Sequence, residues 1–597
     1  NEPFQMRTRT LEIGLRQENY ENTVTQYLAG LRMPIGDTGW RVEGYVSEGR
    51  TKIINTQSGN VDLVKLEQLL SAADGGNALC AGGFNPFGAN PLSAACRTFL
   101  RVDLQPTRDL IQQIGQVYAS GDVMDLPAGP LSVVVGAEYR NIESKANPGS
   151  GAENISGFTL EDPEDGTSSF KDFFGEALIP LVKDAPFAKT LELNLGYRYS
   201  LAEFADKLTG FKSDEDSSSS FKAEINWQPV DILRFRASYQ RAVRAPNFEE
   251  LFAGGNDAPQ YFDPCSKGGV LRSGGSAAQV AALCGATGVG DVAGYVQTPG
   301  SQLTAYLAGN NQLESERGDT ITIGAVFSTP WENQWTERLR GSIDYYNIKV
   351  KDAILRPQIN RIVADCFNYY GNNPTFSPTY VACNQTLIRG GGDILQLDNR
   401  YPGGIYDPVN DAYPFQFTNQ GRIETSGIDF QVDYGFDWEW LGLSPSWGGV
   451  KANVIISKLF EYKSKSLSSL PLLDTAGTVS YFGAGLGQSF PEWRVTGTAA
   501  WTFGDFDVLG RTRYIGKMDN RLSVEFPGET FGGTKGVWYT DVSAGWKATD
   551  TVEVRLGVNN AFDKKPPQYS PNVQSGTDPS VFDVVGRRVF AQLRLRF

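Results

Sequence analysis

Six cysteines are the residues whose spacing points most directly to covalent chemistry. They form three local pairs along the chain: Cys80 with Cys96, Cys265 with Cys284, and Cys366 with Cys383. None has the C-x-x-C spacing of a metal or redox site, and each pair flanks a stretch of loop-like sequence. We therefore expect three disulfides that staple loops in an oxidising compartment such as the periplasm, with free thiols as the alternative.

The chain has no histidine among its 597 residues. The absence of histidine excludes Ser/His/Asp triads, Cys/His pairs and histidine-ligated zinc sites. No other pairing of a nucleophile with a base suggests a catalytic site. We expect no enzyme activity, no cofactor and no dedicated metal site. The net charge of −14 also argues against a nucleic-acid partner.

Two acidic clusters could hold a calcium ion. The first is formed by residues 214–216 and the second by Asp162, Glu164 and Asp165. Neither has the spaced ligand pattern of a dedicated calcium loop, so a solvated loop is the preferred interpretation.

Aromatic residues concentrate between residues 352 and 419, among Asn, Gly and Asp. Amphipathic rings beside amides can stack on a ligand and satisfy its polar groups. The candidate ligand contacts are Tyr369, Tyr370, Tyr401, Tyr406, Tyr413 and Phe415. The alternative is that these rings pack the loops against one another.

The elements that must position these residues are strands in which apolar and polar side chains strictly alternate. In the segment 551–560, Val552, Val554, Leu556 and Val558 share one face, while Glu553, Arg555, Gly557 and Asn559 share the other. Such period-two alternation places one face against an apolar medium and the other against water. The 66 glycines and 12% aromatic residues fit many strands and turns.

About 18 such strands are expected, beginning with residues 7–16, and many are as long as a tilted membrane strand requires. Very short connections alternate with long polar loops, and all six cysteines fall in the three longest loops. Residues 61–73 and 107–116 are expected to be helical. This pattern predicts an all-β fold, a transmembrane antiparallel β-barrel with short periplasmic turns and long extracellular loops.

No run of 18 consecutive apolar residues occurs, so a transmembrane helix is not expected. A barrel strand needs only every second side chain to be apolar, which leaves this route across the bilayer open. No linker or composition break divides the chain, and we treat residues 1–597 as one barrel domain.

Several segments resemble the barrel of TonB-dependent receptors. They are YQRAVRAPNFEELF at residues 239–252, GNNQLESERGDTITIGAVF at 309–327, GVNNAFDKKPP at 557–567, and the terminal RVFAQLRLRF at 588–597. Together these segments span roughly the second half of the chain, and their order is fairly specific for this family. The terminal Phe597 resembles the signal that the barrel-insertion machinery reads, although it could simply end a strand.

The resemblance implies uptake energised by TonB and its inner-membrane complex, across the outer membrane of a Gram-negative bacterium. It also implies lipid and lipopolysaccharide as surroundings, and a scarce nutrient as cargo: a siderophore, cobalamin, a carbohydrate or similar, small or oligomeric. Family members have an N-terminal plug and 22 strands. We expect the plug and the first few strands to be missing from this sequence, or the plug to be a separate chain. A passive porin or channel is the second hypothesis and a barrel enzyme the third.

Overall fold

The computed structural model describes residues 11–596, with gaps. The gaps are residues 86, 88–90, 150–154, 157–162, 254–255, 262, 268–269, 273, 297–302, 330–332, 358, 385–386, 390–394, 398–414, 481–488, 526–531 and 570–575. Within the described residues, no helix is long and apolar enough to cross a membrane.

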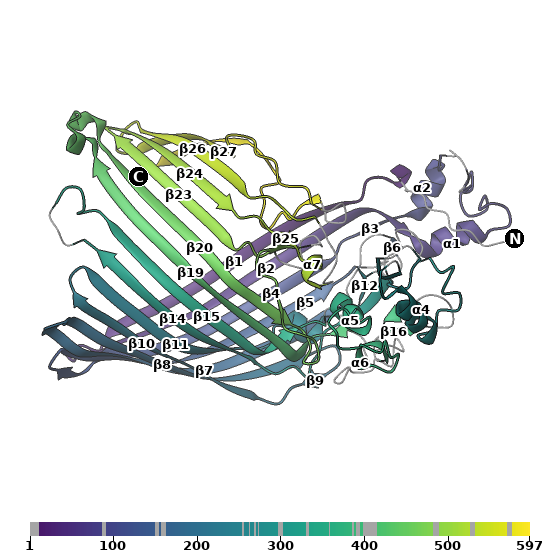
Figure 1. Cartoon of the computed structure of the whole chain (residues 1–597), viewed down its shortest axis with the longest axis horizontal. Helices are drawn as coiled ribbons and strands as arrows, with labels where there is room; N and C mark the ends of the chain where they lie inside the picture. Colours follow the sequence, from purple (N-terminus) through teal and green to yellow (C-terminus); the bar gives the residue numbers. More distant parts are fainter. Residues whose placement is uncertain are drawn as a thin grey trace.

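One antiparallel sheet dominates the described chain, and seventeen of its strands have eight residues or more (Figure 1). These are β1 (Gln17–Pro34), β2 (Arg41–Asp62), β4 (Thr107–Leu126), β5 (Gly129–Asn147), β7 (Glu164–Ala185), β8 (Ala188–Asp206), β10 (Asp216–Val230), β11 (Leu233–Arg244), β14 (Glu316–Ser328), β15 (Arg340–Leu355), β19 (Thr418–Asp437), β20 (Gly449–Lys465), β23 (Trp493–Phe503), β24 (Phe506–Ile515), β26 (Val537–Lys547), β27 (Val552–Asn559) and β28 (Arg588–Leu595).

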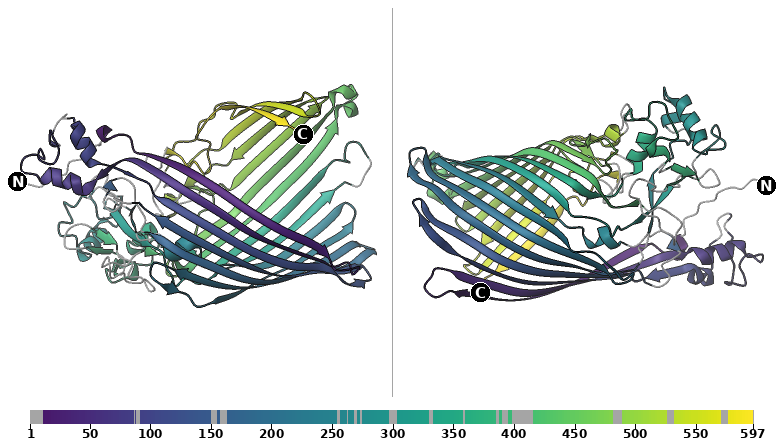
Figure 2. Two further views of the ribbon diagram at one scale, coloured as in Figure 1. Left: turned by 180° about the vertical axis from the view of Figure 1, so that it is seen from behind. Right: turned by 90° about the horizontal axis from the view of Figure 1, so that it is seen from below.

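Each long strand pairs with the next long strand along the chain, so the order in the sheet is the order in the sequence. The strands are strongly inclined to the long axis and curve around a common interior (Figure 2). Among the described strands β28 does not pair with β1, so these two are the edges of the sheet. The prediction of an all-β antiparallel barrel is confirmed.

The remaining strands are short and lie in the connections. They are β3 (Arg101–Leu104), β6 (Ile155–Ser156), β9 (Phe211–Lys212), β12 (Asn256–Tyr261), β13 (Leu303–Ala308), β16 (Leu387–Arg389), β17 (Leu395–Leu397), β18 (Phe415–Gln416), β21 (Leu473–Asp474), β22 (Thr478–Val479) and β25 (Asp519–Asn520).

The helices are also short. They are α1 (Leu63–Ser71), α2 (Ala94–Leu100), α3 (Phe248–Phe252), α4 (Ala277–Ala286), α5 (Ile359–Cys366), α6 (Val381–Asn384) and α7 (Leu522–Glu525), with 3-10 turns η1 (Leu11–Ile13), η2 (Val270–Arg272), η3 (Trp438–Leu441) and η4 (Pro445–Trp447). All seven α-helices belong to the long loops at one end of the sheet, and most are labelled on the right in Figure 1. We call this end the loop end and the other the short-turn end.

Two local predictions were wrong and one was confirmed. The expected strand at residues 7–16 is the turn η1 over Leu11–Ile13, and its first residues lie outside those described. The expected helix at 107–116 is the first half of β4, because that segment pairs in continuous register with β2 and β5 on both sides. The expected helix at 61–73 is α1, whose N-cap Asp62 accepts a hydrogen bond from the Lys65 amide at 3.0 Å.

The apolar side chains of the sheet lie on its outer face. On β26, Trp538, Val542 and Trp546 are exposed, whereas Tyr539 and Asp541, on the opposite face, are buried. A soluble sheet would bury its apolar face, so this reversed arrangement fits strands whose apolar side faces lipid.

The inner face carries cross-strand ion pairs. Arg236 on β11 and Asp344 on β15 make two contacts of 2.8 and 2.7 Å. Gly324 lies between them on the intervening β14, directly opposite both residues. Asp507 and Arg555 repeat the arrangement across Gly545.

Candidate functional site

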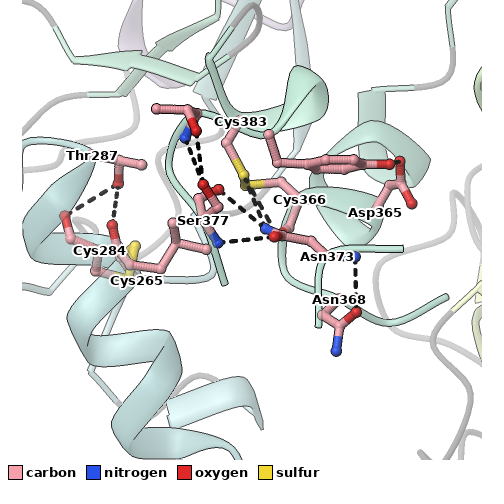
Figure 3. Close-up of a disulfide and its surroundings, with 12 residues drawn as sticks. Cys265, Cys284, Thr287, Asp365, Cys366, Asn368, Asn373, Ser377 and Cys383 are labelled. Atoms are coloured by element: carbon pink, nitrogen blue, oxygen red, sulfur yellow. Dashed lines mark hydrogen bonds between the residues drawn. A yellow bond between two sulfur atoms is a disulfide. The ribbon is translucent and has the colours of Figure 1, made fainter. Parts of the chain in front are cut away.

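The three cysteine pairs are disulfide-bonded as their spacing predicts, and each bond closes within a single loop. Two of them, Cys265–Cys284 and Cys366–Cys383, share one buried apolar cluster (Figure 3). Leu467 and Leu470, from the loop that follows β20, complete this cluster. We call it the loop cap, because it joins three long loops at the loop end.

Polar contacts shape the loop that carries Cys366 and Cys383. Asn373 is 2% exposed; its side-chain amide donates to the Cys366 carbonyl at 2.8 Å, and its carbonyl accepts from the Ser377 amide at 2.8 Å (Figure 3). Asp365 accepts from the Tyr380 hydroxyl at 2.8 Å and from the Asn372 side chain at 2.7 Å. Burial raises the pKa of Asp365.

Arg361 is a buried cation on α5, beside Ile362 and Val363 of the loop cap. Its guanidinium donates to the Ser464 carbonyl at 2.7 Å and to the Pro471 carbonyl. Burial lowers the pKa of Arg361 from its ordinary range. Backbone carbonyls at the end of β20 and in the loop that follows it thus replace the water that the guanidinium loses, as a buried charge requires.

Around Arg361 lies a polar network formed by its own loop and by the loop that follows β24. Glu525 of α7, Arg521 just before α7, and Tyr370 all interact with it electrostatically, and burial raises the pKa of Tyr370. Arg521 also lies over the Phe490 ring, 5.4 Å from its centroid. We call Arg361, Tyr370, Arg521 and Glu525 the loop-end network.

An aromatic pair supports the loop-end network from the barrel side. Tyr462 on β20 stacks on Phe490, with centroids 3.7 Å apart and an interplanar angle of 18°. The network therefore joins the loops that follow β15, β20 and β24. Arg361, Arg521 and Glu525 are all buried, and the two cations lie near the Glu525 carboxylate, so the network holds the loops together; its groups do not form a nucleophile and base pair.

The proposed ligand contacts are only partly described. Tyr369 packs against the loop cap, and Tyr370 belongs to the loop-end network. Tyr401, Tyr406 and Tyr413 lie outside the described residues, as does the barrel-terminal Phe597, and the side chain of Phe415 in β18 is not described. For Tyr369 the structure favours the packing interpretation.

Sequence reasoning missed Arg361, Arg521 and Glu525. The one local signal for Arg361 was its place beside apolar residues in α5. A charged side chain that is buried there needs a polar partner. Arg361 and Arg521 are far apart in the sequence, so their meeting depends on how the loops fold.

Two of the four segments that carried the family resemblance, residues 239–252 and 309–327, meet at the loop end of β11 and β14. Arg244 pairs with Glu250 at 2.8 Å and with Glu316 at 2.7 Å. Asn247 caps α3 through a capping box with Glu250. The Asn310 amide donates to the Glu250 carbonyl at 2.8 Å. Residues 239–252 and 309–327 therefore form one structural junction.

The acidic clusters bind cations of the chain itself. Glu215 pairs with Lys171 at 3.0 Å, and Glu164 with Arg108 at 3.0 Å. Asp162 lies outside the described residues. Within the part of the chain that the structure describes, no group of three acidic or cysteine side chains is arranged to hold a metal ion.

Comparisons with known proteins agree with this geometry. The profile of the family described as TonB dependent receptor-like, beta-barrel matches residues 37–561. No curated protein matches the sequence.

Three solved structures share the fold at low identity. The pyoverdine outer membrane receptor FpvA from Pseudomonas aeruginosa PAO1 has a TM-score of 0.52 and 14% identity, covering 97% of this chain and 62% of the receptor. The copper transporter OprC has a TM-score of 0.51 and 13% identity, covering 97% and 67%. The ferric-catecholate import receptor Fiu from K12 E. coli has a TM-score of 0.50 and 12% identity, covering 97% and 65%. The chain thus spans about two thirds of each of these proteins.

Proposed function

The chain belongs to the TonB-dependent receptor β-barrel family, and from this membership we propose that it is the wall and loop cap of an outer-membrane importer. The family match across residues 37–561 carries the proposal. The outward apolar face of the sheet agrees with a lipid environment.

In this proposal the loop end faces the outside of the cell and captures a scarce nutrient. A plug closes the interior of the barrel, and TonB with its inner-membrane complex supplies the energy that opens it. The chain itself spans about two thirds of each of these solved relatives. The barrel-insertion machinery reads the terminal strand, which ends in Phe597.

The loop cap supports capture over passive flow. Three loops share a buried core with two disulfides, and the loop-end network ties in the loop that follows β24. Loops joined in this way form a preorganised binding surface, which lowers the entropic cost of holding a ligand. A porin without energy coupling is the alternative.

The cargo contacts would come from the aromatic loop between residues 352 and 419. In the sequence its tyrosines and phenylalanines stand among Asn, Gly and Asp, a combination suited to a ligand with aromatic and polar groups. Among the cargo classes of the family, ferric siderophores of catecholate or similar type fit this chemistry best.

The decisive experiment uses the full-length gene in an iron-starved host whose own siderophore receptors are deleted. Uptake of a panel of radiolabelled cargoes is measured with and without TonB: siderophores loaded with radioactive iron, cobalamin labelled with radioactive cobalt, and oligosaccharides labelled with radioactive carbon. Uptake of one cargo that disappears without TonB supports the proposal. Uptake that is unchanged without TonB, together with steady conductance in planar bilayers, would establish the passive channel instead.

A further inference from the structure

The inner face of the last strands of the sheet is rich in arginine. On β23, β24, β27 and β28 these arginines alternate with exposed apolar residues such as Trp493, Phe506, Leu556 and Val589, which lie on the outer face. We call the arginines the basic wall: Arg494, Arg511, Arg513, Arg555, Arg588 and Arg594. Three carboxylates lie on the same inner face of β23 to β28, those of Asp507, Asp541 and Glu553.

The inner face of β15 and β19 has the opposite charge. Its carboxylates alternate with the exposed Ile343 and Phe430 of the outer face, and Arg340 is the one cation on the inner face of these two strands. We call the carboxylates the acidic wall: Asp344, Asp429, Asp433 and Asp437. One strand, β20, separates the acidic wall from the basic wall. The charges of the barrel interior are therefore sorted by position and not mixed.

The arginines of the basic wall are incompletely paired. Asp541 is shared by Arg511 at 2.7 Å and Arg513 at 3.4 Å, and the side chains of these two arginines are 47% and 38% exposed. Glu553 is likewise shared, 3.5 Å from Arg594 and 3.8 Å from Arg555.

Arg494 is exposed, and among the described residues no carboxylate lies within ion-pair distance of its guanidinium. A guanidinium has five N–H donors, so arginines that share one carboxylate keep donors for an external anion. The buried Arg361 of the loop cap is different, because backbone carbonyls already satisfy it.

The basic wall continues from the loop end to the short-turn end. Arg511 is opposite Asp541 and Arg555 is opposite Gly545, so four residues of β26, about 14 Å, separate their levels. Arg555 shortens this step, since its guanidinium donates to the Ser543 hydroxyl at 3.1 Å. Arg594 follows one row further, opposite Glu553, after about 7 Å.

We propose that the basic wall guides an anionic cargo along the inside of the barrel, from the loop end to the short-turn end. This rests on the proposed function, because import requires the cargo to pass through the interior. It also names the substrate class, a complex with net negative charge such as a ferric catecholate. Several incompletely paired sites in series favour passage, since each holds the anion without trapping it. The acidic wall repels the same anion and keeps it on the basic side.

The test measures the electrostatic potential that a solute meets on each wall of the full-length protein in outer-membrane vesicles. All six cysteines of the chain are in disulfides, so they do not compete with an introduced thiol. Thr498→Cys lies opposite Arg511, and Gln431→Cys lies between Asp429 and Asp433 on the inner face of β19. Each variant is labelled with two methanethiosulfonates of similar size, one with an anionic sulfonate and one with a cationic trimethylammonium group.

At Thr498→Cys the anionic reagent should react at least about fivefold faster than the cationic one, and at Gln431→Cys the order should reverse. Adding Arg494→Gln/Arg511→Gln should remove most of the preference at Thr498→Cys. The control Arg50→Gln/Lys52→Gln, on the outer face of β2 with the exposed Val46, should leave it unchanged. If the arginine variant does not fold, judged by migration on unheated gels, the comparison of the two cysteines alone decides. Equal rates for the two reagents at both positions, or no reaction at either, would overturn the proposal.

The uptake assay separates this proposal from the proposed function. Arg494→Gln/Arg511→Gln should lower the maximal TonB-dependent uptake rate at least about fivefold, without changing cargo binding to cells that lack TonB. An unchanged maximal rate, or a neutral cargo selected by the uptake panel, would overturn the role of the basic wall. The labelling needs neither cargo nor TonB. A charge preference without any uptake would therefore refute the proposed function, whereas uptake without a charge preference would refute the basic wall alone.

Discussion

Arg236 and Asp344 form their ion pair directly over Gly324, which takes the place where a side chain on β14 would separate them. A Cβ at position 324 would lie 1.9 Å from the Asp344 carboxylate. The glycine is therefore what permits the pair, and Gly545 stands in the same relation to Asp507 and Arg555.

We expect Gly324→Ala to displace Asp344 and break this ion pair, at a cost of about 1 kcal/mol in the free energy of unfolding. The measurement is urea unfolding of the protein in lipid vesicles. Gly510→Ala is the matched control, because no atom lies within 4 Å of its added Cβ. If the pair is what the glycine protects, Gly324→Ala should have little further effect once Asp344 is Ala, which removes both the ion pair and the atoms that the new Cβ would strike.

Arg361→Met should loosen the loop cap while leaving the barrel folded. The change removes the buried donors to the Ser464 and Pro471 carbonyls, which costs roughly 2 to 3 kcal/mol for hydrogen bonds from a charged group. Limited proteolysis of the loops, followed by mass spectrometry, reports this loosening. Lys535→Met changes an exposed loop position, and its loops should be cleaved by the protease at the same rate as those of the wild type. If the loops of Arg361→Met resist the protease as well as those of the wild type, the guanidinium does not anchor the loop cap.

The loop cap should become more stable on acidification through Asp365. Its pKa is raised by burial, so the folded loop binds the proton more tightly than the unfolded loop does. This stabilisation is complete below the ordinary Asp pKa of about 4, and it is lost as the pH rises through the raised value. Hydrogen exchange of residues 359–383, measured between pH 4 and 7, checks it. Asp365→Asn should flatten the pH dependence, and a dependence that survives this change must come from another group.

Removal of one disulfide should affect the loop that it closes and the cluster that it shares. Cys366→Ser/Cys383→Ser opens a segment with a sequence separation of 17, which costs about 3 kcal/mol if native strain is small. Hydrogen exchange should rise around Cys265–Cys284 as well, because the two bonds share one core. Cys80→Ser/Cys96→Ser should leave that core unchanged, since Cys80 and Cys96 belong to a separate cluster.

Replacing Tyr401, Tyr406 and Tyr413 together with Ala should weaken cargo binding at least about tenfold, if each ring contributes about 0.5 kcal/mol or more of stacking. Binding is measured by tryptophan fluorescence with the cargo that the uptake panel selects. Tyr27→Ala/Tyr197→Ala, on the lipid-facing side of the barrel, is the control. Unchanged affinity would assign these aromatic residues to loop packing.

The wall of the barrel could be predicted from the sequence because its signal is local. Alternation such as that of Val552 to Val558 sets the face of each residue, and the turn residues set the strand ends. The segment 107–116 shows where local reading fails: Leu110, Ile111 and Ile114 have helix-like spacing, but pairing with Ile53, Thr51 and their neighbours on β2 decides the outcome.

The loop-end network could not be predicted for a different reason. Arg361 meets Arg521 and Glu525 only after three loops have folded over the same end of the sheet. No spacing in the sequence encodes that meeting. The cysteine pairs could be predicted because both partners lie in one loop.

Because each disulfide closes within one loop, no disulfide obliges two loops to change together in evolution. A crosslink between two loops would force both to change together, whereas a self-contained bridge lets one be replaced with its own crosslink intact. The segment from Cys80 to Cys96, whose core is its own, fits such exchange, whereas the segment from Cys366 to Cys383 shares a core with Cys265–Cys284 and would have to preserve that contact.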